Sequence, residues 1–241
     1  MDFEQTQKTQ ESVLARGLRR CGFHVVILGC ISAGKTTLAN ALQRVIEKET
    51  GQCECLREPV EDNPLLPLYY QDPKRYAFPM QIHMLNKRLA QQRVAQDLAL
   101  AGKNSVQDSS VFGDSCFVEM LFKDGILMAE EVDVYADLFA NMTRDIMYPS
   151  AVVYLNTSPE VALERLNKRN RSCESGIPIE YLANLKRELD ALILEFGRYS
   201  PTIVLDGDID MTPEEIDKRA EDLWETIKQT RNTPIVNRQG V

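Results

Sequence analysis

The sequence predicts an α/β fold in three layers, in which helices flank a five-stranded parallel sheet. A glycine-rich loop at 29–36 lies between a strand-like stretch and a helix-like stretch. Along the 241 residues, five short apolar stretches alternate with longer stretches of helical periodicity. This alternation is typical of a parallel sheet that is covered on both faces. No linker-like run or internal repeat divides the chain.

The first strand and the first helix frame the glycine-rich loop. Residues 23–28 are apolar and β-branched, as in a buried strand, and apolar residues recur at helical spacing through 37–46. The second strand is expected at 53–57, because Pro59 cannot continue its hydrogen-bond ladder. A loop with a short helical piece is expected over 60–73.

The middle of the chain is mainly helical. A long helix is expected at 74–101, with an apolar stripe and with Gly102 ending it. Residues 104–108 form a short third strand, and helical patterns follow over 113–123 and 130–147.

The last third completes the sheet. The fourth strand is expected at 151–155, and Ser158 and Pro159 then open a helix as N-cap and first-turn residue. Gly176-Ile177-Pro178 breaks that helix. Three further elements follow: an amphipathic helix from Tyr181 to Phe196, a strand at 202–205, and a last helix that opens with a capping box at 212–215.

Composition limits the classes of partner. The net charge of −8 argues against a nucleic acid polymer or an anionic membrane, whereas a small anion needs only a local basic pocket. Six cysteines without a C-x-x-C pair indicate a reducing compartment. Acidic residues near the N-terminus argue against a transit peptide, so we expect a cytoplasmic rather than a mitochondrial protein. We expect a flexible arm at 1–20, one domain at 21–230 and a loose tail at 231–241.

The glycine-rich loop fits the phosphate-binding pattern G-x-x-x-x-G-K-[ST]. Glycines let the backbone N–H groups turn toward a phosphate, and the following helix adds its partial positive charge. Lys35 supplies a full charge for the outer phosphates, and the Thr36 hydroxyl can ligate Mg²⁺. The residues expected to bind a nucleotide here are Gly29, Cys30, Ile31, Ser32, Ala33, Gly34, Lys35, Thr36 and Thr37.

Other polar residues lie where a substrate would bind. Glu58 and Asp108 follow strands, at the edge of the sheet where open α/β folds bind ligands. Each carboxylate suits a general base or a Mg²⁺ ligand, or else simply caps a loop. Gln81 and Arg88 lie in the apolar stripe of the long helix, where burial would require partners for them. The alternative is a helix edge in contact with solvent.

A basic cluster follows the fourth strand. Arg165 and Arg169 share a helix face, and Arg171 precedes the Gly-Pro break. A mobile arginine-rich lid would stabilise charge in phosphoryl transfer. Part of the cluster can instead be a solvated face, because Glu164 and Lys168 form an i,i+4 pair.

These motifs together resemble the deoxyribonucleoside kinase family, which includes deoxycytidine, deoxyguanosine and deoxyadenosine kinases. The stretch 58–66 and the pattern from Tyr76 to Arg88 look most like its bacterial purine branch, and 169–182 looks like its lid and following helix. The resemblance covers roughly 22–228. It implies a P-loop kinase-like fold, transfer of the ATP γ-phosphoryl group to the 5′-hydroxyl of a deoxynucleoside, nucleotide salvage, and a homodimer built through the helices around 74–101 and 113–147.

The resemblance also implies roles for individual residues. Glu58 would be the catalytic base, and Thr36 and Asp108 would hold Mg²⁺. Arg165, Arg169 and Arg171 would form the lid over the phosphates, with Lys35 beneath them. Gln81 would contact the base, helped by the Arg88–Asp114 ion pair, and Tyr70 and Glu174 would bind the sugar. The loop Asp206-Gly207-Asp208 would lie near the base of the donor. The Arg/Asp pair resembles the purine and cytosine branch rather than the thymidine branch.

One position departs from the family pattern. The family has Asp/Glu-Arg-Ser after the third strand, where this chain has Asp108-Ser109-Ser110. The missing arginine would hold the catalytic carboxylate and the 5′ oxygen. We therefore expect slow turnover unless a substitute cation, such as Arg57 or a lid arginine, takes its place. The alternatives are a nucleoside monophosphate kinase and a non-catalytic nucleotide-binding or scaffold relative.

Overall fold

The computed structural model describes residues 21–59, 63–169 and 176–230. The expected arm at 1–20 and tail at 231–241 lie outside the described residues, as do Arg171 and Glu174. None of the helices in the described part of the chain combines the length and the apolar character that crossing a membrane requires.

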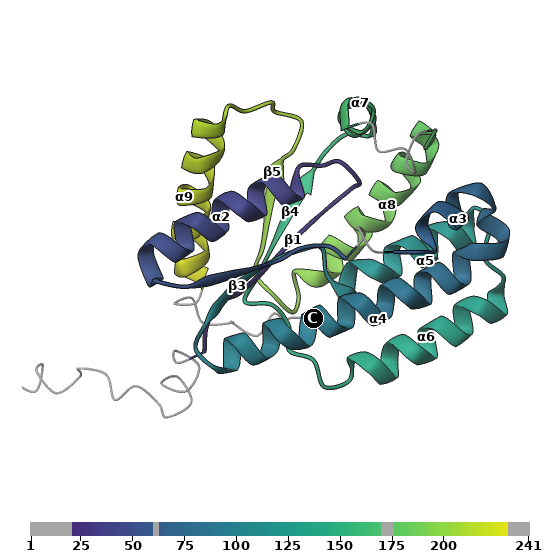
Figure 1. Cartoon of the computed structure of the whole chain (residues 1–241), viewed down its shortest axis with the longest axis horizontal. Coiled ribbons are helices and arrows are strands. Elements are labelled where there is room, and N and C mark those ends of the chain that lie inside the picture. The colour runs from purple at the N-terminus through teal and green to yellow at the C-terminus, as the bar shows by residue number, and fades with distance from the viewer. Residues whose placement is uncertain (1–20, 60–62, 170–175, 231–241) are drawn as a thin grey trace, which may run out of the picture.

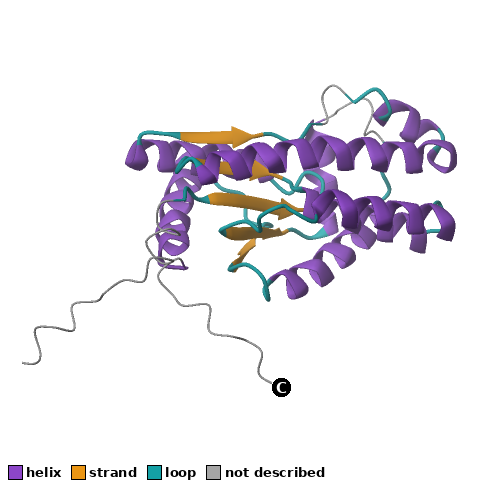
Figure 2. Cartoon of the chain, turned by 90° about the horizontal axis from the view of Figure 1, so that it is seen from below, coloured by secondary structure: helices purple, strands orange, loops and turns teal. Residues whose placement is uncertain are grey.

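The centre of the molecule is a parallel five-stranded sheet, as the sequence predicts (Figures 1 and 2). Its spatial order is β2-β3-β1-β4-β5. The strands are β1 (His24–Gly29), β2 (Cys53–Leu56), β3 (Asn104–Asp108), β4 (Ala151–Asn156) and β5 (Thr202–Asp206). Because β1 is central, the loop that follows it opens at the middle of the carboxyl edge.

Helices cover both faces of this sheet. On one face lie α2 (Lys35–Thr50) and α9 (Pro213–Thr230), which pack on each other. The other face is covered by α4 (Pro73–Leu100), α5 (Asp114–Lys123) and α8 (Ile179–Phe196) (Figure 1). The remaining helices are α3 (Leu66–Gln71), the 3₁₀ turn η2 (Val111–Gly113), α6 (Ala129–Thr143) and α7 (Pro159–Arg169).

The alternation of side chains along β1 creates the two cores. Val25 and Ile27 pack toward α2 and α9, while Val26 and Leu28 pack toward α4, α5 and α8. Successive strand side chains point to opposite faces, so a strand that is apolar at every position can be buried on both.

Most element boundaries agree with the sequence prediction to within a few residues. The exception is α6, which was expected to reach residue 147 and ends at Thr143. The chain turns at Arg144 and Asp145 and then runs toward Pro149, whose ring disfavours helical geometry in the residue before it.

Candidate active site

A cavity of about 790 Å³ opens at the carboxyl edge of the sheet. Its walls come from the glycine-rich loop, the segment after β2, the end of β3, α4 and the loop after β5. Most of the residues predicted from the sequence line it: Gly29, Ile31, Ser32, Ala33, Gly34, Lys35, Thr36, Thr37, Glu58, Tyr70, Gln81, Arg88, Asp108, Arg165, Arg169 and Gly207. Cys30, Asp114, Asp206 and Asp208 are not among the lining residues, although Asp114 forms the expected ion pair with Arg88.

The glycine-rich loop needs its small residues for close packing. A Cβ on Gly29 would lie 3.0 Å from the Leu155 carbonyl oxygen, and Gly34 has a φ of 94°. The Lys35 ammonium donates to the carbonyls of Gly29 and Cys30, at 3.2 and 2.9 Å. The Cys30 thiol donates weakly to the Leu182 carbonyl at 3.7 Å, so only the backbone of Cys30 can contribute to phosphate binding.

A hydroxyl and a carboxylate meet at the start of α2. The Thr36 hydroxyl donates to Asp108 Oδ2 at 2.5 Å, and Asp108 Oδ1 is buried without a hydrogen-bond partner among the described residues. Burial raises the pKa of Asp108, and the charge of Lys35 partly opposes this. Two oxygen donors of this kind fit Mg²⁺, which takes few protein ligands and completes its shell with phosphate and water. No group of three or more His, Cys, Asp or Glu side chains suited to a metal occurs in the described ranges.

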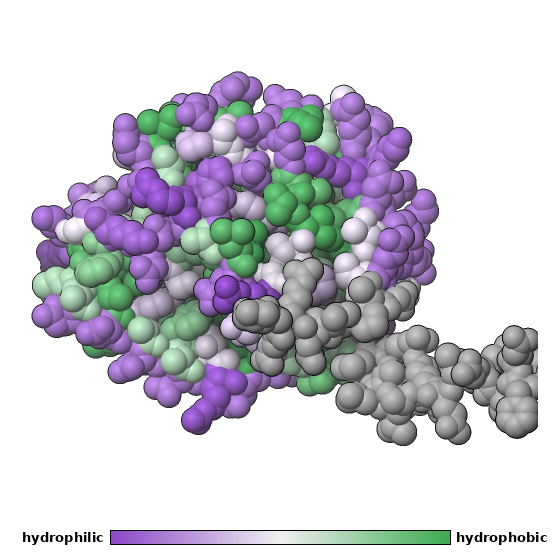
Figure 3. Space-filling view, turned by 180° about the vertical axis from the view of Figure 1, so that it is seen from behind, coloured by the Kyte–Doolittle hydropathy of each residue, from purple (hydrophilic) through white to green (hydrophobic). Residues whose placement is uncertain are grey.

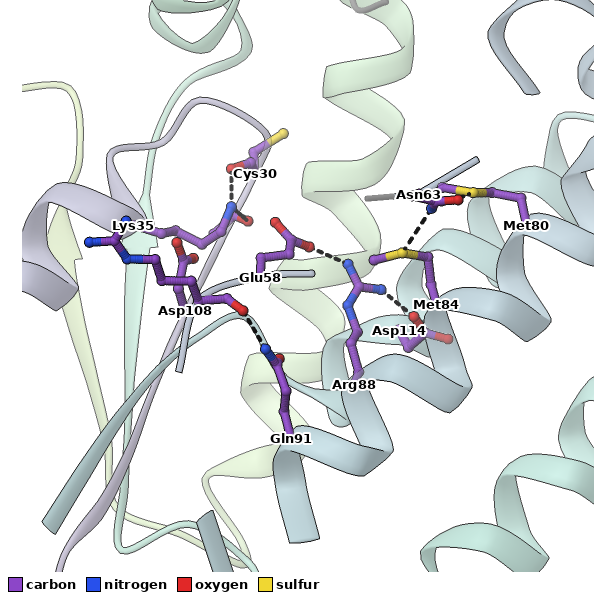
Figure 4. Close-up of polar contacts among 12 residues, drawn as sticks. Cys30, Lys35, Glu58, Asn63, Met80, Met84, Arg88, Gln91, Asp108 and Asp114 are labelled. Atoms are coloured by element: carbon purple, nitrogen blue, oxygen red, sulfur yellow. Dashed lines mark hydrogen bonds and ion pairs between the residues drawn. The ribbon is translucent and has the colours of Figure 1, made fainter. Parts of the chain in front are cut away.

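Arg88 joins two carboxylates at the other wall of the cavity (Figure 4). Its guanidinium donates through Nη2 to Glu58 Oε1 and through Nη1 to Asp114 Oδ1. Arg88 is 3% exposed and Glu58 keeps 22% of its side-chain surface exposed. Burial alone would raise the pKa of Glu58, but the charges of Arg88 and Lys35 outweigh it and lower that pKa. Glu58 is therefore ionised at neutral pH.

The cation that pairs with Glu58 is not one that the sequence predicted. Arg57 and the lid arginines were the expected substitutes for the missing family arginine, whereas the structure places Arg88 on Glu58. Arg57 is exposed, and its backbone carbonyl accepts from Gln91. Ser109 also contacts Glu58 through a side-chain hydrogen bond, from a backbone with φ of 67°.

Around Met80 and Met84 of α4 the cavity wall is apolar apart from Gln81. Gln81 is 4% exposed, and its Oε1 has no hydrogen-bond partner among the described residues. The Asn63 amide donates to the sulfurs of Met80 and Met84, at 3.1 and 3.3 Å, and holds these two cavity-lining side chains in place. An unpaired acceptor amid apolar side chains suits a planar ligand with a hydrogen-bonding edge. The alternative of a solvent-exposed helix edge is wrong for Gln81 and Arg88.

The basic cluster on α7 divides into two parts. Arg165 donates to the Gly207 carbonyl at 2.6 Å, the Ile209 carbonyl at 3.4 Å and Asp210 Oδ1 at 2.8 Å. It therefore ties α7 to the loop after β5 as well as lining the cavity. Lys168 and Glu164 form the expected exposed i,i+4 pair.

The loop after β5 is shaped by the two aspartates that were expected to contact the donor. Asp206 Oδ1 accepts from the Asp208 amide at 2.9 Å, and Asp208 Oδ1 accepts from the Ser158 amide at 2.7 Å. Their carboxylates are thus used within the protein. Only Gly207 of the three lines the cavity, and a Cβ there would lie 2.1 Å from Thr157 Oγ1.

Sequence reasoning missed other residues of the cavity wall. Five of them come from the last part of the chain: Ile209, Asp210, Met211, Ile216 and Arg219. No local pattern distinguishes Arg219 from the other charged residues of α9. Its place at the cavity depends on the packing of α9 beside α2.

This fold and site define a class, the P-loop phosphotransferases: a parallel sheet, a phosphate loop with Lys35, and an ionised Glu58 across the cavity from it. The sequence model described as "Deoxynucleoside kinase" matches residues 25–231. The chain belongs to the deoxynucleoside kinase family and is a nucleoside kinase.

Individual relatives agree with this assignment. The chain is 36% identical over 207 residues to a deoxyadenosine kinase of Dictyostelium discoideum, covering 86% of this chain and 81% of that one. It is 31% identical over 225 residues to a deoxyguanosine kinase of Lactobacillus acidophilus, covering 88% and 93%. Among solved structures, deoxyadenosine kinase from M. mycoides with the products dCMP and dCDP superposes with a TM-score of 0.72 at 27% identity, covering 86% of this chain and all of that one.

Proposed function

We propose that this kinase transfers the γ-phosphoryl group of ATP to the 5′-hydroxyl of a purine or cytosine deoxyribonucleoside. The observation that carries the proposal is the placement of Glu58, an ionised carboxylate at the wall of the same cavity as the phosphate loop. Such a group can accept the hydroxyl proton as the oxygen attacks phosphorus.

The residues at the phosphate end favour binding of a nucleoside triphosphate. The backbone of 29–36 and the Lys35 ammonium supply donors for phosphate oxygens. Thr36 and Asp108 would hold Mg²⁺, which when bound neutralises phosphate charge. Arg169 lines the cavity beside them and adds positive charge. Arg171, which belongs to the same proposed lid, lies outside the described residues.

The residues at the other end favour a nucleobase with both donors and acceptors on its edge. Gln81 Oε1 offers a free acceptor, and Arg88 Nε has no hydrogen-bond partner in the described part of the chain. Both Asp114 oxygens accept hydrogen bonds within the protein, so Asp114 acts through Arg88. Tyr70 lines the cavity and suits contact with the sugar, a role proposed also for Glu174, outside the described residues.

The comparisons with known proteins support purine and cytosine deoxynucleosides as the class of substrate. The relatives include kinases of deoxyadenosine and deoxyguanosine, and the structural relative holds products with a cytosine base. We place this chain with them, in nucleotide salvage, because Arg88 and Asp114 form the expected ion pair, which we expect to crowd a 5-methyl group.

A homodimer in the cytoplasm is the state we propose for the enzyme, with one kinase domain at 21–230. The exposed apolar residues Val94 of α4 and Val134 and Leu138 of α6 offer an apolar face for a second copy. Figure 3 shows hydrophobic side chains scattered among hydrophilic ones on the face opposite to that of Figure 1. The free cysteines Cys30, Cys53 and Cys116 suit a reducing compartment. Light scattering of the native chain and of Leu138→Glu tests the dimer.

One panel tests the reaction. Purified protein is incubated with ATP and Mg²⁺ and with each of four deoxynucleosides or their monophosphates, and the products are identified by mass. We expect the monophosphate of deoxyadenosine, deoxyguanosine or deoxycytidine as main product. Thymidine as best substrate would overturn the assignment of the base, and phosphorylation of monophosphates alone would overturn the acceptor.

A further inference from the structure

Tyr135 supports the Arg88–Asp114 ion pair from the side away from the cavity, and it does not line the cavity itself. The Tyr135 hydroxyl donates to Asp114 Oδ2 at 2.6 Å, while Asp114 Oδ1 accepts from Arg88. Tyr135 belongs to α6, whereas Asp114 begins α5 and Arg88 lies on α4. Three helices therefore meet in one line of hydrogen bonds, which ends at Glu58.

Every member of this line except Glu58 is withdrawn from solvent. Asp114 has no exposed surface, and Arg88 and Tyr135 are 3% and 4% exposed. A buried carboxylate whose oxygens are both occupied can take only one orientation, and so can the guanidinium bound to it. Tyr135 is thus in a position to fix the orientation of the Arg88 guanidinium, whose Nε has no hydrogen-bond partner among the described residues.

We propose that Tyr135 is a positioning residue for nucleobase recognition: by holding Asp114 it orients Arg88 toward the base while Arg88 keeps its contact with Glu58. This inference rests on the proposed function, and it concerns a residue that contacts no substrate. It links the choice of base to the catalytic carboxylate, because one guanidinium serves both.

The charge state of Asp114 depends on the same contact. Burial raises the pKa of Asp114, and the charge of Arg88 and the hydrogen bond from Tyr135 act in the opposite direction. Removal of the hydroxyl therefore moves protonation of Asp114 to higher pH. The titratable groups that face Asp114 are Arg88 of α4, Tyr135 of α6, Glu58 after β2, and Cys116 of its own helix.

The chain offers a matched control for Tyr135→Phe. Tyr154 of β4 is 3% exposed, belongs to the same core, and donates to Asp190 Oδ1 at 2.6 Å. Tyr154→Phe therefore removes the hydroxyl of an equally buried side chain from an equally short bond to an aspartate, away from Arg88, although Asp190 itself is 46% exposed. Any general cost to the fold should appear in both variants.

The test measures kcat and KM for each deoxynucleoside and for ATP, and also the Kd of deoxyadenosine by calorimetry without ATP. For Tyr135→Phe we expect about a tenfold rise in the KM and Kd of the preferred nucleoside, kcat within about threefold, and an unchanged KM for ATP. The acid limb of kcat/KM should move to higher pH. Tyr154→Phe should leave all four quantities unchanged.

Two outcomes would overturn the proposal: equal effects of Tyr135→Phe and Tyr154→Phe, or native affinity in Tyr135→Phe. A double variant gives a second measure, because adding Tyr135→Phe to Asp114→Asn should change KM by less than twofold, whereas independent structural effects would multiply. The two proposals fail separately: a native chain that binds deoxyadenosine but does not phosphorylate it overturns only the reaction. A chain that neither binds nor phosphorylates any nucleoside overturns both.

Discussion

Ser109→Arg probes the part of the site where this chain departs from its family pattern. Ser109 lines the cavity, hydrogen-bonds Glu58 and has a φ of 67°. Because serine already has a Cβ at this backbone conformation, the substitution adds little new backbone strain. The longer side chain can extend into a cavity of about 790 Å³.

The structure sets the size of the expected gain. A missing cation beside the reacting atoms would cost about 3–4 kcal/mol, a hundredfold or more in rate. Here Arg88 already pairs with Glu58 and Ser109 already donates to it. What remains is the difference between a hydroxyl and a guanidinium as donor, about 1–2 kcal/mol, so we expect kcat to rise roughly tenfold.

The assay is steady-state kinetics with the preferred deoxynucleoside and ATP. If the new arginine pairs with Glu58, Arg88 can bind Asp114 and the nucleobase without also binding Glu58. The KM of the deoxynucleoside should therefore fall, while the KM of ATP should barely change. Ser109→Met is the matched control, since methionine adds a long side chain without charge.

An unchanged or lower kcat in a Ser109→Arg protein with a native melting temperature would refute this reasoning. So would an equal gain from Ser109→Met, because the effect would then come from packing and not from charge. The first result would mean that Arg88 fully replaces the family arginine, or that the chemistry is a different one.

Three further predictions concern single residues. Lys35→Ala should lower transfer at least about a hundredfold, because no neighbour can replace its charge on the phosphates, and should leave the fold intact, because within the described residues its ammonium bonds only two loop carbonyls; near-normal turnover in a folded variant would exclude a P-loop mechanism. Glu58→Gln should lower kcat far more than deoxynucleoside affinity, since the amide cannot accept the proton, and equal losses would make Glu58 a binding residue only. Burial lowers the pKa of His24 to about 4, so the unfolded chain takes up a proton first as the pH falls below 6.5, and the free energy of unfolding should drop by about 2 kcal/mol between pH 7 and pH 5. Denaturant melts at both pH values should show this drop, and His24→Gln should reduce it; an equal drop in that variant would assign it to other groups.

The order and type of the elements followed from the sequence by itself. Strand and helix periodicities are local, and the phosphate loop is a contiguous motif whose function depends on its own backbone. For the same reason Lys35, Thr36, Glu58 and Asp108 could be placed at one edge of the sheet, because each lies at the carboxyl end of a parallel strand or in the loop or helix start that follows it. Gln81 and Arg88 were recognisable as polar residues within an apolar stripe.

The Arg88–Asp114 pair was implied by the family resemblance, but only the tertiary structure showed that Arg88 also meets Glu58 and that Tyr135 binds Asp114. Arg88 is separated from Glu58 by 30 residues and from Asp114 by 26, and Asp114 from Tyr135 by 21. Such pairs depend on how three helices pack and on the length of each side chain, and no local pattern specifies either. The sequence showed that position 109 lacks an arginine, but the cation that takes its place comes from α4, because burial brings that guanidinium between two carboxylates and desolvation makes their pairing obligatory.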